Sequence, residues 1–311
     1  AVALYASGNA PALLMLDAGD VLLFEDRALA LNDEKWVDDA IANSLDMATD
    51  EDGRILAFPV TVEGFGFIYN RPVLENALGT EFDPKTINTY DALQELFDAI
   101  EASGKGALVI GPEDWSLGAH FFSLAYSGQS LDFDVINEFQ AGLKAGTVSL
   151  ADNAVANGLL DTFDLMKEYN YDKIDPLAST YDRGTELIGV GDVGIWFQGN
   201  WTWPQIKEFD ERGDVQFGFL PVPMSNDPVG LGNTQIPVGV TKYFIVDGEQ
   251  NSPAQQQAAK DFLNWLVYDA EGQRHLVVDA SVIPAFSNIT IVPDDPLAAS
   301  LLDYVKEGRT I

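Results

Sequence analysis

The fold of this chain can be inferred first from residues 52–71, which read DGRILAFPVTVEGFGFIYNR. A turn at Gly53 precedes the apolar run Ile55–Pro59, and a second run, Phe65–Tyr69, follows the acidic residue Glu63. Short runs rich in β-branched and aromatic residues predict strands, so we expect one strand on each side of Glu63. A carboxylate between two buried strands is unusual, because most Glu side chains are solvated.

Working outward from this stretch, helical periods and short strand-like runs alternate along the chain. This pattern predicts an α/β protein whose sheets are mainly parallel. Besides the two strands above, the expected strands are Ala12–Leu16, Ala107–Ile110, Gly194–Phe197, Val215–Phe219 and Lys242–Val246. The expected helices include Asp33–Met47, Val73–Leu78, Ser116–Tyr126, Asn153–Tyr169, Ala254–Tyr268, Glu271–Val278 and Leu297–Lys306.

The clearest helix follows Asn88–Thr89. Its apolar residues recur at helical spacing and predict one buried face, and Gly104 is a stop signal. That face consists of Leu93, Leu96, Phe97 and Ile100. The longest segment without a firm element is the Pro- and Gly-rich stretch Leu220–Gly239, and long irregular segments of this kind are often functional.

Composition restricts the classes of partner. With 311 residues and 47% hydrophobic content, the chain is long enough for two domains or one bilobal unit. It carries 17 Lys and Arg against 49 Asp and Glu, a net charge of −32, which disfavours nucleic acid and anionic lipid and fits an uncharged ligand. No apolar run approaches the length that a bilayer-spanning helix needs.

Catalytic and metal chemistry have little to build on. The chain contains no Cys, and its two His, His120 and His275, lie far apart, so we predict no catalytic residue, no metal site and no cofactor. Residues 189–194 spell G-x-G-x-x-G, but they follow a helical stretch and lead into a strand, the reverse of a dinucleotide site. Residues 50–53 resemble part of a calcium loop whose closing ligands are missing.

Six stretches in order resemble family 1 extracellular solute-binding proteins, the maltose-binding-protein-like group. They are Gly8–Met15, Asp52–Arg71, Thr89–Leu93, Gly191–Trp201, Gly218–Pro223 and Ala258–Gln273. The resemblance implies two α/β lobes joined by three hinge crossings, near 62–65, 235–240 and 292–296. One lobe would comprise 1–62 and 241–291, and the other 66–236 and 297–311. Terminal parts of the family fold are expected to be absent from this chain.

The resemblance also implies a function. The protein would be the extracytoplasmic substrate-binding subunit of an ABC importer, which captures a carbohydrate, in particular an oligosaccharide, in an interlobe cleft and delivers it to the permease. It is expected to be a monomer. It would be periplasmic, or lipid-anchored at the cell surface by a signal segment that this chain lacks.

A sugar offers C–H faces and a rim of hydroxyls, so its site needs flat aromatic rings and planar polar groups. Trp201 follows the strand Gly194–Phe197, where the family places a stacking aromatic, and Trp203 is two residues further on. One of these two tryptophans is expected to belong to the core rather than to the site. Trp115 follows the strand Ala107–Ile110, and it either contacts ligand or anchors its loop.

The polar candidates lie near the expected crossings. Glu63 matches an acidic hinge position of the family, and a carboxylate can accept two hydroxyl hydrogen bonds. Asp17 and Asp20 fit the family's cleft loop, or else form a polar turn. Asn233 and Gln235 each combine a donor and an acceptor at the second crossing.

Two other functions stay open. The same fold could bind a polyamine, a metal ion or a glycerol phosphate, and the strongly negative net charge is compatible with a cationic ligand. A glycoside hydrolase is the less favoured choice, since its carboxylate pair is defined by a separation in space that sequence spacing does not reveal.

Overall fold

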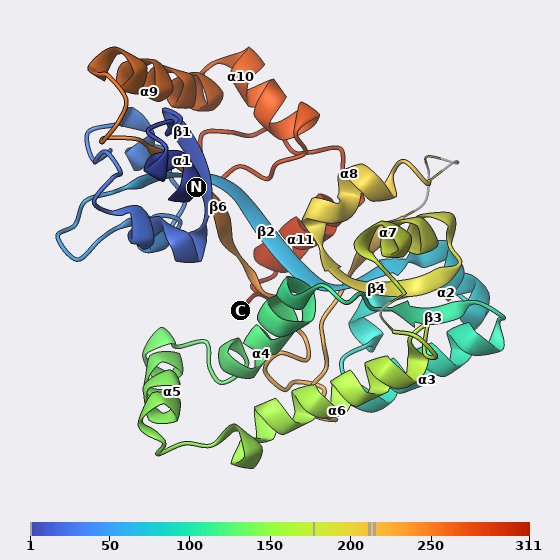
Figure 1. The fold of residues 1–311 in the computed structure, drawn as a ribbon. Coiled ribbons are helices and arrows are strands. Elements are labelled where there is room, and N and C mark those ends of the chain that lie inside the picture. Colours follow the sequence, from blue (N-terminus) through green and yellow to red (C-terminus); the bar gives the residue numbers. More distant parts are fainter. Residues whose placement is uncertain (1, 177, 211–212, 214–215) are drawn as a thin grey trace. The chain divides into compact units, whose positions relative to one another are not determined.

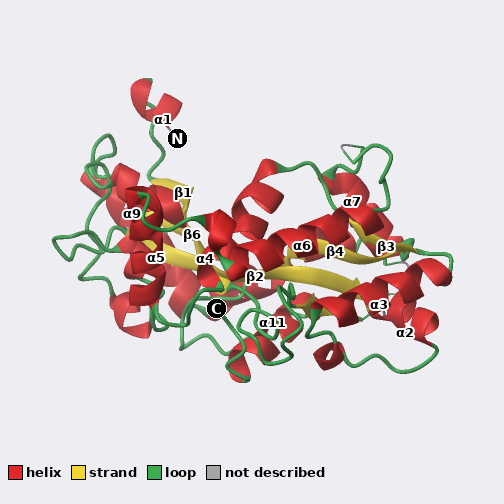
Figure 2. Cartoon of the chain, turned by 90° about the horizontal axis from the view of Figure 1, so that it is seen from below, coloured by secondary structure: helices red, strands yellow, loops and turns green. Residues whose placement is uncertain are grey.

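The computed structural model describes residues 2–176, 178–210, 213 and 216–311, and the chain divides into two compact units (Figure 1). Unit 1 comprises Ala1–Glu63 and Gly239–Asp294, and unit 2 comprises Gly64–Val238 and Asp295–Ile311. The chain therefore passes between the units three times, and each unit is discontinuous in sequence. The predicted α/β class is confirmed (Figure 2).

Unit 1 is built on the antiparallel pair β1–β6, in which Asp17 lies opposite Lys242. In its core, Trp36 packs edge to face against Phe58 and against Phe286, and buried residues of helix α9 belong to the same cluster. The elements of unit 1 are α1 (Val2–Ala6), β1 (Leu13–Asp17), β6 (Val238–Val246), α9 (Pro253–Tyr268), α10 (Ala270–Arg274), a π-helix (His275–Asp279) and 3₁₀ helices at Ala18–Phe24, Lys35–Asp39 and Asp46–Ala48.

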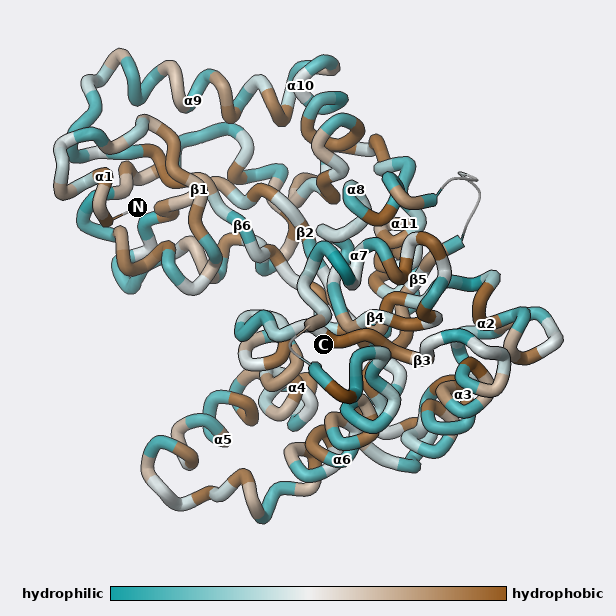
Figure 3. The backbone as a smooth tube through the Cα atoms, turned by 45° about the vertical axis from the view of Figure 1, so that its right-hand side comes forward, coloured by the Kyte–Doolittle hydropathy of each residue, from teal (hydrophilic) through white to brown (hydrophobic). Residues whose placement is uncertain are grey.

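Unit 2 is built on β3 and β4, a parallel pair, and on β2, which pairs antiparallel with β4 and β5. Helices α3 and α6 pack against β3, and α7 packs against β4. Strand β3 is mostly hydrophobic (brown in Figure 3), and both β3 and β4 are largely buried, as expected for strands covered by helices. The strands of unit 2 are β3 (Gly106–Val109), β4 (Val193–Gly199) and β5 (Phe217–Leu220). Its helices are α2 (Arg71–Leu78), α3 (Tyr90–Ala102), α4 (Phe122–Ser127), α5 (Phe133–Ala145), α6 (Ala154–Tyr169), α7 (Tyr181–Val190), α8 (Trp203–Ile206) and α11 (Pro296–Lys306), with a π-helix at Trp115–Phe121 and 3₁₀ helices at Pro84–Thr86, Leu150–Asp152 and Asn200–Thr202.

Helix α3 confirms the strongest helix prediction. The hydroxyl of Thr89 accepts the Ala92 N–H at 3.1 Å, a cap that stabilises a helix by about 1 kcal/mol. The four predicted apolar side chains are all buried, and each contributes about 1.5–3 kcal/mol of burial free energy. Gly104, just beyond the helix, has a φ of +87°, a conformation that glycine adopts without strain.

Strand β2 (Ala57–Asn70) differs from its prediction. We expected two strands separated by a crossing, and the structure has one strand of 14 residues that belongs partly to each unit. Gly64 and Gly66 make no turn, because neither has a positive φ. They allow close packing instead: a Cβ on Gly66 would lie 2.6 Å from the carbonyl oxygen of Leu220. A glycine in a strand interior often marks such an approach rather than a break.

The strand directions also differ from the prediction. The sheets are mixed rather than mainly parallel, because only the β3–β4 pair is parallel among the paired strands whose register is described.

The predicted helix over Asp33–Met47 was wrong. Two short 3₁₀ helices take its place, and Asn43 has a left-handed φ of 64°, which a continuous α-helix excludes.

The other predicted helices and strands agree with the structure to within a few residues at their ends, and some elements were not predicted. Helices α1, α5 and α8 were not predicted, and α7 was anticipated only as the helical stretch that precedes residues 189–194. No helix or strand occurs between β5 and β6, as expected for this Pro- and Gly-rich segment. Of the predicted strand at 215–219, Val215 lies outside the described residues, and β5 begins at Phe217. Among the described residues, no helix is both long and apolar enough to cross a membrane.

Candidate functional site

Two tryptophans follow the carboxyl ends of the neighbouring parallel strands in unit 2. Trp115 begins the π-helix after β3, and Trp201 lies in the 3₁₀ turn after β4. Because β3 and β4 are parallel and paired, both segments leave the same edge of the sheet. In α/β sheets this edge is where ligands bind.

At this edge five rings form what we call the aromatic group: Phe65, Trp115, His120, Tyr181 and Trp201. The indoles of Trp115 and Trp201 have centroids 6.2 Å apart and planes inclined by 66°, and the His120 ring lies 5.1 Å from Trp201. The His120 ring also stacks on Phe65 at 4.9 Å, and Tyr181 lies 6.1 Å from Trp115. Trp115 is 38% exposed and Trp201 is partly buried, so apolar ring surface stays in contact with solvent.

The backbone of β4 sets the position of Trp201. A Cβ on Gly199 would lie 2.1–2.4 Å from three atoms of the indole's six-membered ring, so this ring lies directly against the glycine. The hydroxyl of Thr202 donates to the Gly199 carbonyl at 2.8 Å and holds the turn. Asn200, between them, accepts the Gly64 N–H at 2.9 Å.

Trp203 has a different environment from Trp201. It is 8% exposed, begins α8, and packs against Phe217 with ring centroids 5.8 Å apart. The prediction that one of these two tryptophans belongs to the core therefore describes Trp203, and we leave it out of the proposed site.

The candidate carboxylates of unit 1, Asp17 at the end of β1 and Glu63 on β2, each contact a residue of β6. Glu63 accepts a hydrogen bond from the Thr241 hydroxyl, and Asp17 forms an ion pair with Lys242. We call these four residues the carboxylate group. Burial raises the pKa of the Glu63 carboxyl above its usual value; the Thr241 hydroxyl and the Lys242 ammonium oppose the rise, and the Asp17 charge adds to it.

The other polar candidates are placed as follows. Asp20 is exposed on the 3₁₀ helix that follows β1, so it is adjacent in sequence to the carboxylate group. Asn233 is fully buried and its amide holds its own loop: its oxygen accepts the Met224 N–H at 2.8 Å, and its nitrogen donates to two carbonyls and one hydroxyl. The Gln235 side chain accepts the Gly232 N–H at 2.8 Å. Because both amides stabilise the backbone, we leave them out of the proposed site.

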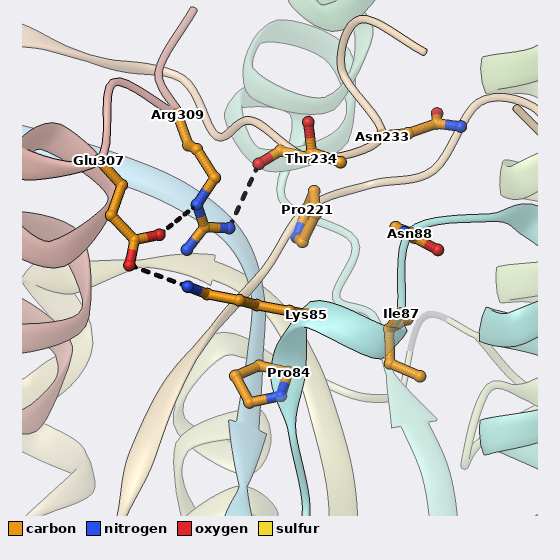
Figure 4. Close-up of a pocket in the computed structure, with 9 residues that line it drawn as sticks. All are labelled: Pro84, Lys85, Ile87, Asn88, Pro221, Asn233, Thr234, Glu307 and Arg309. Atoms are coloured by element: carbon orange, nitrogen blue, oxygen red, sulfur yellow. Dashed lines mark hydrogen bonds and ion pairs between the residues drawn. The ribbon is translucent and has the colours of Figure 1, made fainter. Parts of the chain in front are cut away.

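A pocket of about 180 Å³ in unit 2 is a poor candidate for the site (Figure 4). Its charged residues neutralise one another: Glu307 accepts from Lys85 at 2.9 Å and from Arg309 at 2.7 Å. Among the described residues no aromatic ring lines it, and the remaining lining residues are Pro84, Pro221, Ile87, Asn88, Asn233 and Thr234. A ligand would meet charges that are already paired.

Three members of the aromatic group were missed from the sequence: Phe65, His120 and Tyr181. In an α-helix, residues five apart are separated by roughly 140° around the axis, so Trp115 and His120 would not be expected on one face. The π-helix has more residues per turn, and it brings the two rings to 5.5 Å. The spacing of apolar residues in this segment does not distinguish a π-helix from an α-helix.

Within the ranges that the structure describes, no group of three or more His, Asp or Glu could hold a metal ion. Partly exposed flat rings at the carboxyl ends of a parallel strand pair are typical of a site for a small solute. The fold and the aromatic group of unit 2 thus define the class, an α/β protein with a candidate site for a small solute.

The comparisons identify the family. The chain belongs to the bacterial extracellular solute-binding protein family, whose model matches residues 1–299. A curated relative, the melibiose/raffinose/stachyose-binding protein MelE of Bacillus subtilis (strain 168), is 21% identical over 285 residues, which cover 90% of this chain and 61% of the relative. The chain thus spans less than two thirds of the length of that relative. The family and this relative are both described as binding proteins, which agrees with the prediction of a binding protein rather than an enzyme.

Solved structures share the fold. The structure of RafE in complex with raffinose matches with a TM-score of 0.76 at 15% identity, over 99% of this chain and 77% of that one. A sugar transporter from Bacillus licheniformis in complex with stachyose matches with a TM-score of 0.73 at 20% identity, over 100% of this chain and 76% of that one. At these identities the likeness concerns the fold alone.

Proposed function

We propose that this protein is the extracytoplasmic substrate-binding subunit of an ABC importer and that its substrate is a neutral oligosaccharide. The observation that carries the proposal is the aromatic group, with two partly exposed indoles at the ligand-binding edge of a parallel strand pair. Inclined indoles present stacking surfaces to the C–H faces of sugar rings. Names of similar proteins, which bind raffinose, stachyose and melibiose, support the same class of ligand.

In this proposal the ligand stacks on Trp201 and Trp115, and its hydroxyls bond to Glu63, Asp17 and Asp20. Contacts with groups of both units would favour a closed arrangement, because they exist only when both groups touch the same ligand. A membrane permease would then accept the loaded protein. We further propose that the protein acts as a monomer, in the periplasm or held at the cell surface by a lipid anchor.

The first test is a thermal-shift panel followed by calorimetry. The panel contains raffinose, stachyose, melibiose, maltotriose and chitin oligosaccharides, with spermidine and glycerol 3-phosphate as the cationic and anionic alternatives. A specific binder raises the melting temperature by mass action. Stabilisation by an oligosaccharide is the expected result, and stabilisation by spermidine alone would replace the proposal with a polyamine carrier. Reducing ends released during incubation would indicate a hydrolase.

Gly199→Ala tests whether ligand binding depends on the position of the Trp201 ring against Gly199. The added methyl group must displace the Trp201 ring, which is partly exposed and has solvent to move into. We expect a stability loss of about 1–3 kcal/mol, in the range of other overpacking changes, and a weaker affinity for the best oligosaccharide of the panel. Calorimetry and thermal unfolding measure both. An unchanged affinity would show that the position of the ring does not matter to the ligand.

Glu63→Gln tests the buried carboxylate. The folded-state pKa of Glu63 is raised, so ionisation costs the folded state: the stability tied to the protonated form is complete below the unfolded pKa, about 4.3, and is lost as pH rises through the higher folded pKa. The Gln variant avoids this loss. Its melting temperature relative to the wild type should therefore increase from pH 4 to pH 7.

The same variant should bind the oligosaccharide about tenfold more weakly at pH 7, because an amide accepts hydroxyl hydrogen bonds less strongly than a carboxylate. The matched control is Glu249→Gln, an exposed carboxylate of unit 1 that pairs with Arg27. It should change neither the affinity nor the pH profile. Equal affinities of Glu63→Gln and wild type would remove Glu63 from the site.

A further inference from the structure

Asn200 completes the hydrogen-bond ladder at the point where β4 ends. The pairing of β2 with β4 reaches Phe65 opposite Gly199, and the chain then turns into the 3₁₀ helix. The Gly64 N–H lies beyond this last pair, and the side-chain oxygen of Asn200 accepts it at 2.9 Å. Asn200 is only 4% exposed, so this hydrogen bond is shielded from water. A buried N–H without a partner costs about 1–3 kcal/mol.

The peptide that Asn200 holds is the one that joins the two units in β2, since Glu63 is the last residue of unit 1 in this segment and Gly64 the first of unit 2. Gly64 has no room for a side chain: a Cβ there would lie 2.7 Å from the Leu301 side chain and 2.9 Å from the Pro237 carbonyl oxygen. The backbone on the unit 2 side of this peptide is therefore closely confined by unit 2 alone.

Asn200 is also next in sequence to Trp201 of the aromatic group. Its neighbour Trp201 carries the ring that lies against Gly199. The Asn200 side chain thus links the backbone that follows Glu63 to the backbone that carries Trp201. Glu63 and Trp201 are the principal polar and aromatic candidates for contact with the ligand. Its oxygen is engaged by the Gly64 N–H, which gives it a different role from that of a ligand-contacting amide.

We propose that Asn200 is a positioning residue: its hydrogen bond to Gly64 fixes the backbone from which the Glu63 and Trp201 side chains project, and carbohydrate affinity depends on it. The inference rests on the proposed function. It requires that loss of the acceptor weakens binding beyond any general loss of stability, and that a side chain that keeps the acceptor preserves binding.

The test compares Asn200→Ala, Asn200→Asp and Asn70→Ala. Asp keeps an oxygen acceptor and is the conservative variant. Asn70 is the matched control because it lies at the far end of β2 in unit 2, is 2% exposed, and bonds to the backbone through the Val73 N–H at 3.4 Å and the Ile188 carbonyl at 2.9 Å. The ligands are raffinose, stachyose and maltotriose, titrated by calorimetry.

We expect Asn200→Ala to bind the best of these sugars about fivefold more weakly, and Asn200→Asp to bind within about twofold of the wild type. Asn70→Ala should lower the melting temperature and leave the affinity unchanged. Hydrogen exchange gives a readout that needs no sugar: the Gly64 amide should exchange faster in Asn200→Ala than in the wild type or in Asn70→Ala.

The outcomes separate the inference from the function. If the wild type binds a sugar and Asn200→Ala binds it equally well, the inference is overturned and the function stands. An equal loss of affinity in Asn70→Ala also overturns it, because the effect would then be one of stability. If the wild type binds none of the sugars of the panel, the proposed function fails, and unchanged exchange at Gly64 in Asn200→Ala would independently overturn the positioning role.

Discussion

Trp201→Ala should weaken oligosaccharide binding by at least about tenfold, equivalent to about 1.4 kcal/mol, and leave the protein folded. The indole is partly exposed and rests on Gly199, so its removal exposes backbone at the surface rather than opening a cavity in the core. The ligand would lose one of the two inclined ring surfaces and the apolar contact area that goes with it. Calorimetry with the best sugar of the panel measures the change.

Trp265→Ala is the matched control for that experiment. Trp265 is a partly buried tryptophan on α9 of unit 1 and stacks on Phe262 with ring centroids 5.9 Å apart. Its removal should cost stability and leave the affinity unchanged. Wild-type affinity in Trp201→Ala would exclude Trp201 from the site. The proposed function would then lose the observation on which it depends.

Trp203→Ala should have the opposite profile from Trp201→Ala, with a stability loss of about 3–5 kcal/mol, as is typical of large-to-small changes of a buried tryptophan. Trp203 is buried, packs against Phe217, and begins the short helix α8. Urea unfolding of the variant measures the loss. At a temperature where the variant is fully folded, its affinity for the oligosaccharide should stay within about twofold of the wild type.

The contrast between the two variants is informative because the residues are two positions apart. A Trp203→Ala protein that is as stable as the wild type would contradict its assignment to the core. A variant that is well folded but binds no oligosaccharide would return Trp203 to the site. Trp203→Phe is the useful intermediate, since it keeps an aromatic ring against Phe217 and should recover most of the lost stability.

Much of the fold could be predicted from local patterns. Helix α3 is correct in its cap, its buried face and its end, because all three depend on residues within one segment. The helix predicted over 33–47 and the break between strands predicted near Glu63 were wrong for a common reason. In both, the backbone follows tertiary packing: Asn43 adopts a left-handed conformation, and the glycines of β2 permit close approach rather than a turn.

The site was only partly predictable. Trp115 and Trp201 could be predicted because each follows a strand of recognisable pattern, and the family resemblance indicates the same segment. Phe65, His120 and Tyr181 come from three separate elements, and they meet only because β2, β4 and the segments that follow β3 lie side by side. The choice between Trp201 and Trp203 likewise needed the packing of Phe217.

By itself, then, the sequence determined the α/β class, the family and the kinds of side chain available for binding, because composition, periodicity and motif order are properties of the chain alone. Only the tertiary structure decided which rings share one edge of unit 2, which tryptophan is buried, and which amides are committed to the backbone. Exposure and hydrogen bonding depend on atoms contributed by segments distant in sequence, and local patterns carry no record of those neighbours.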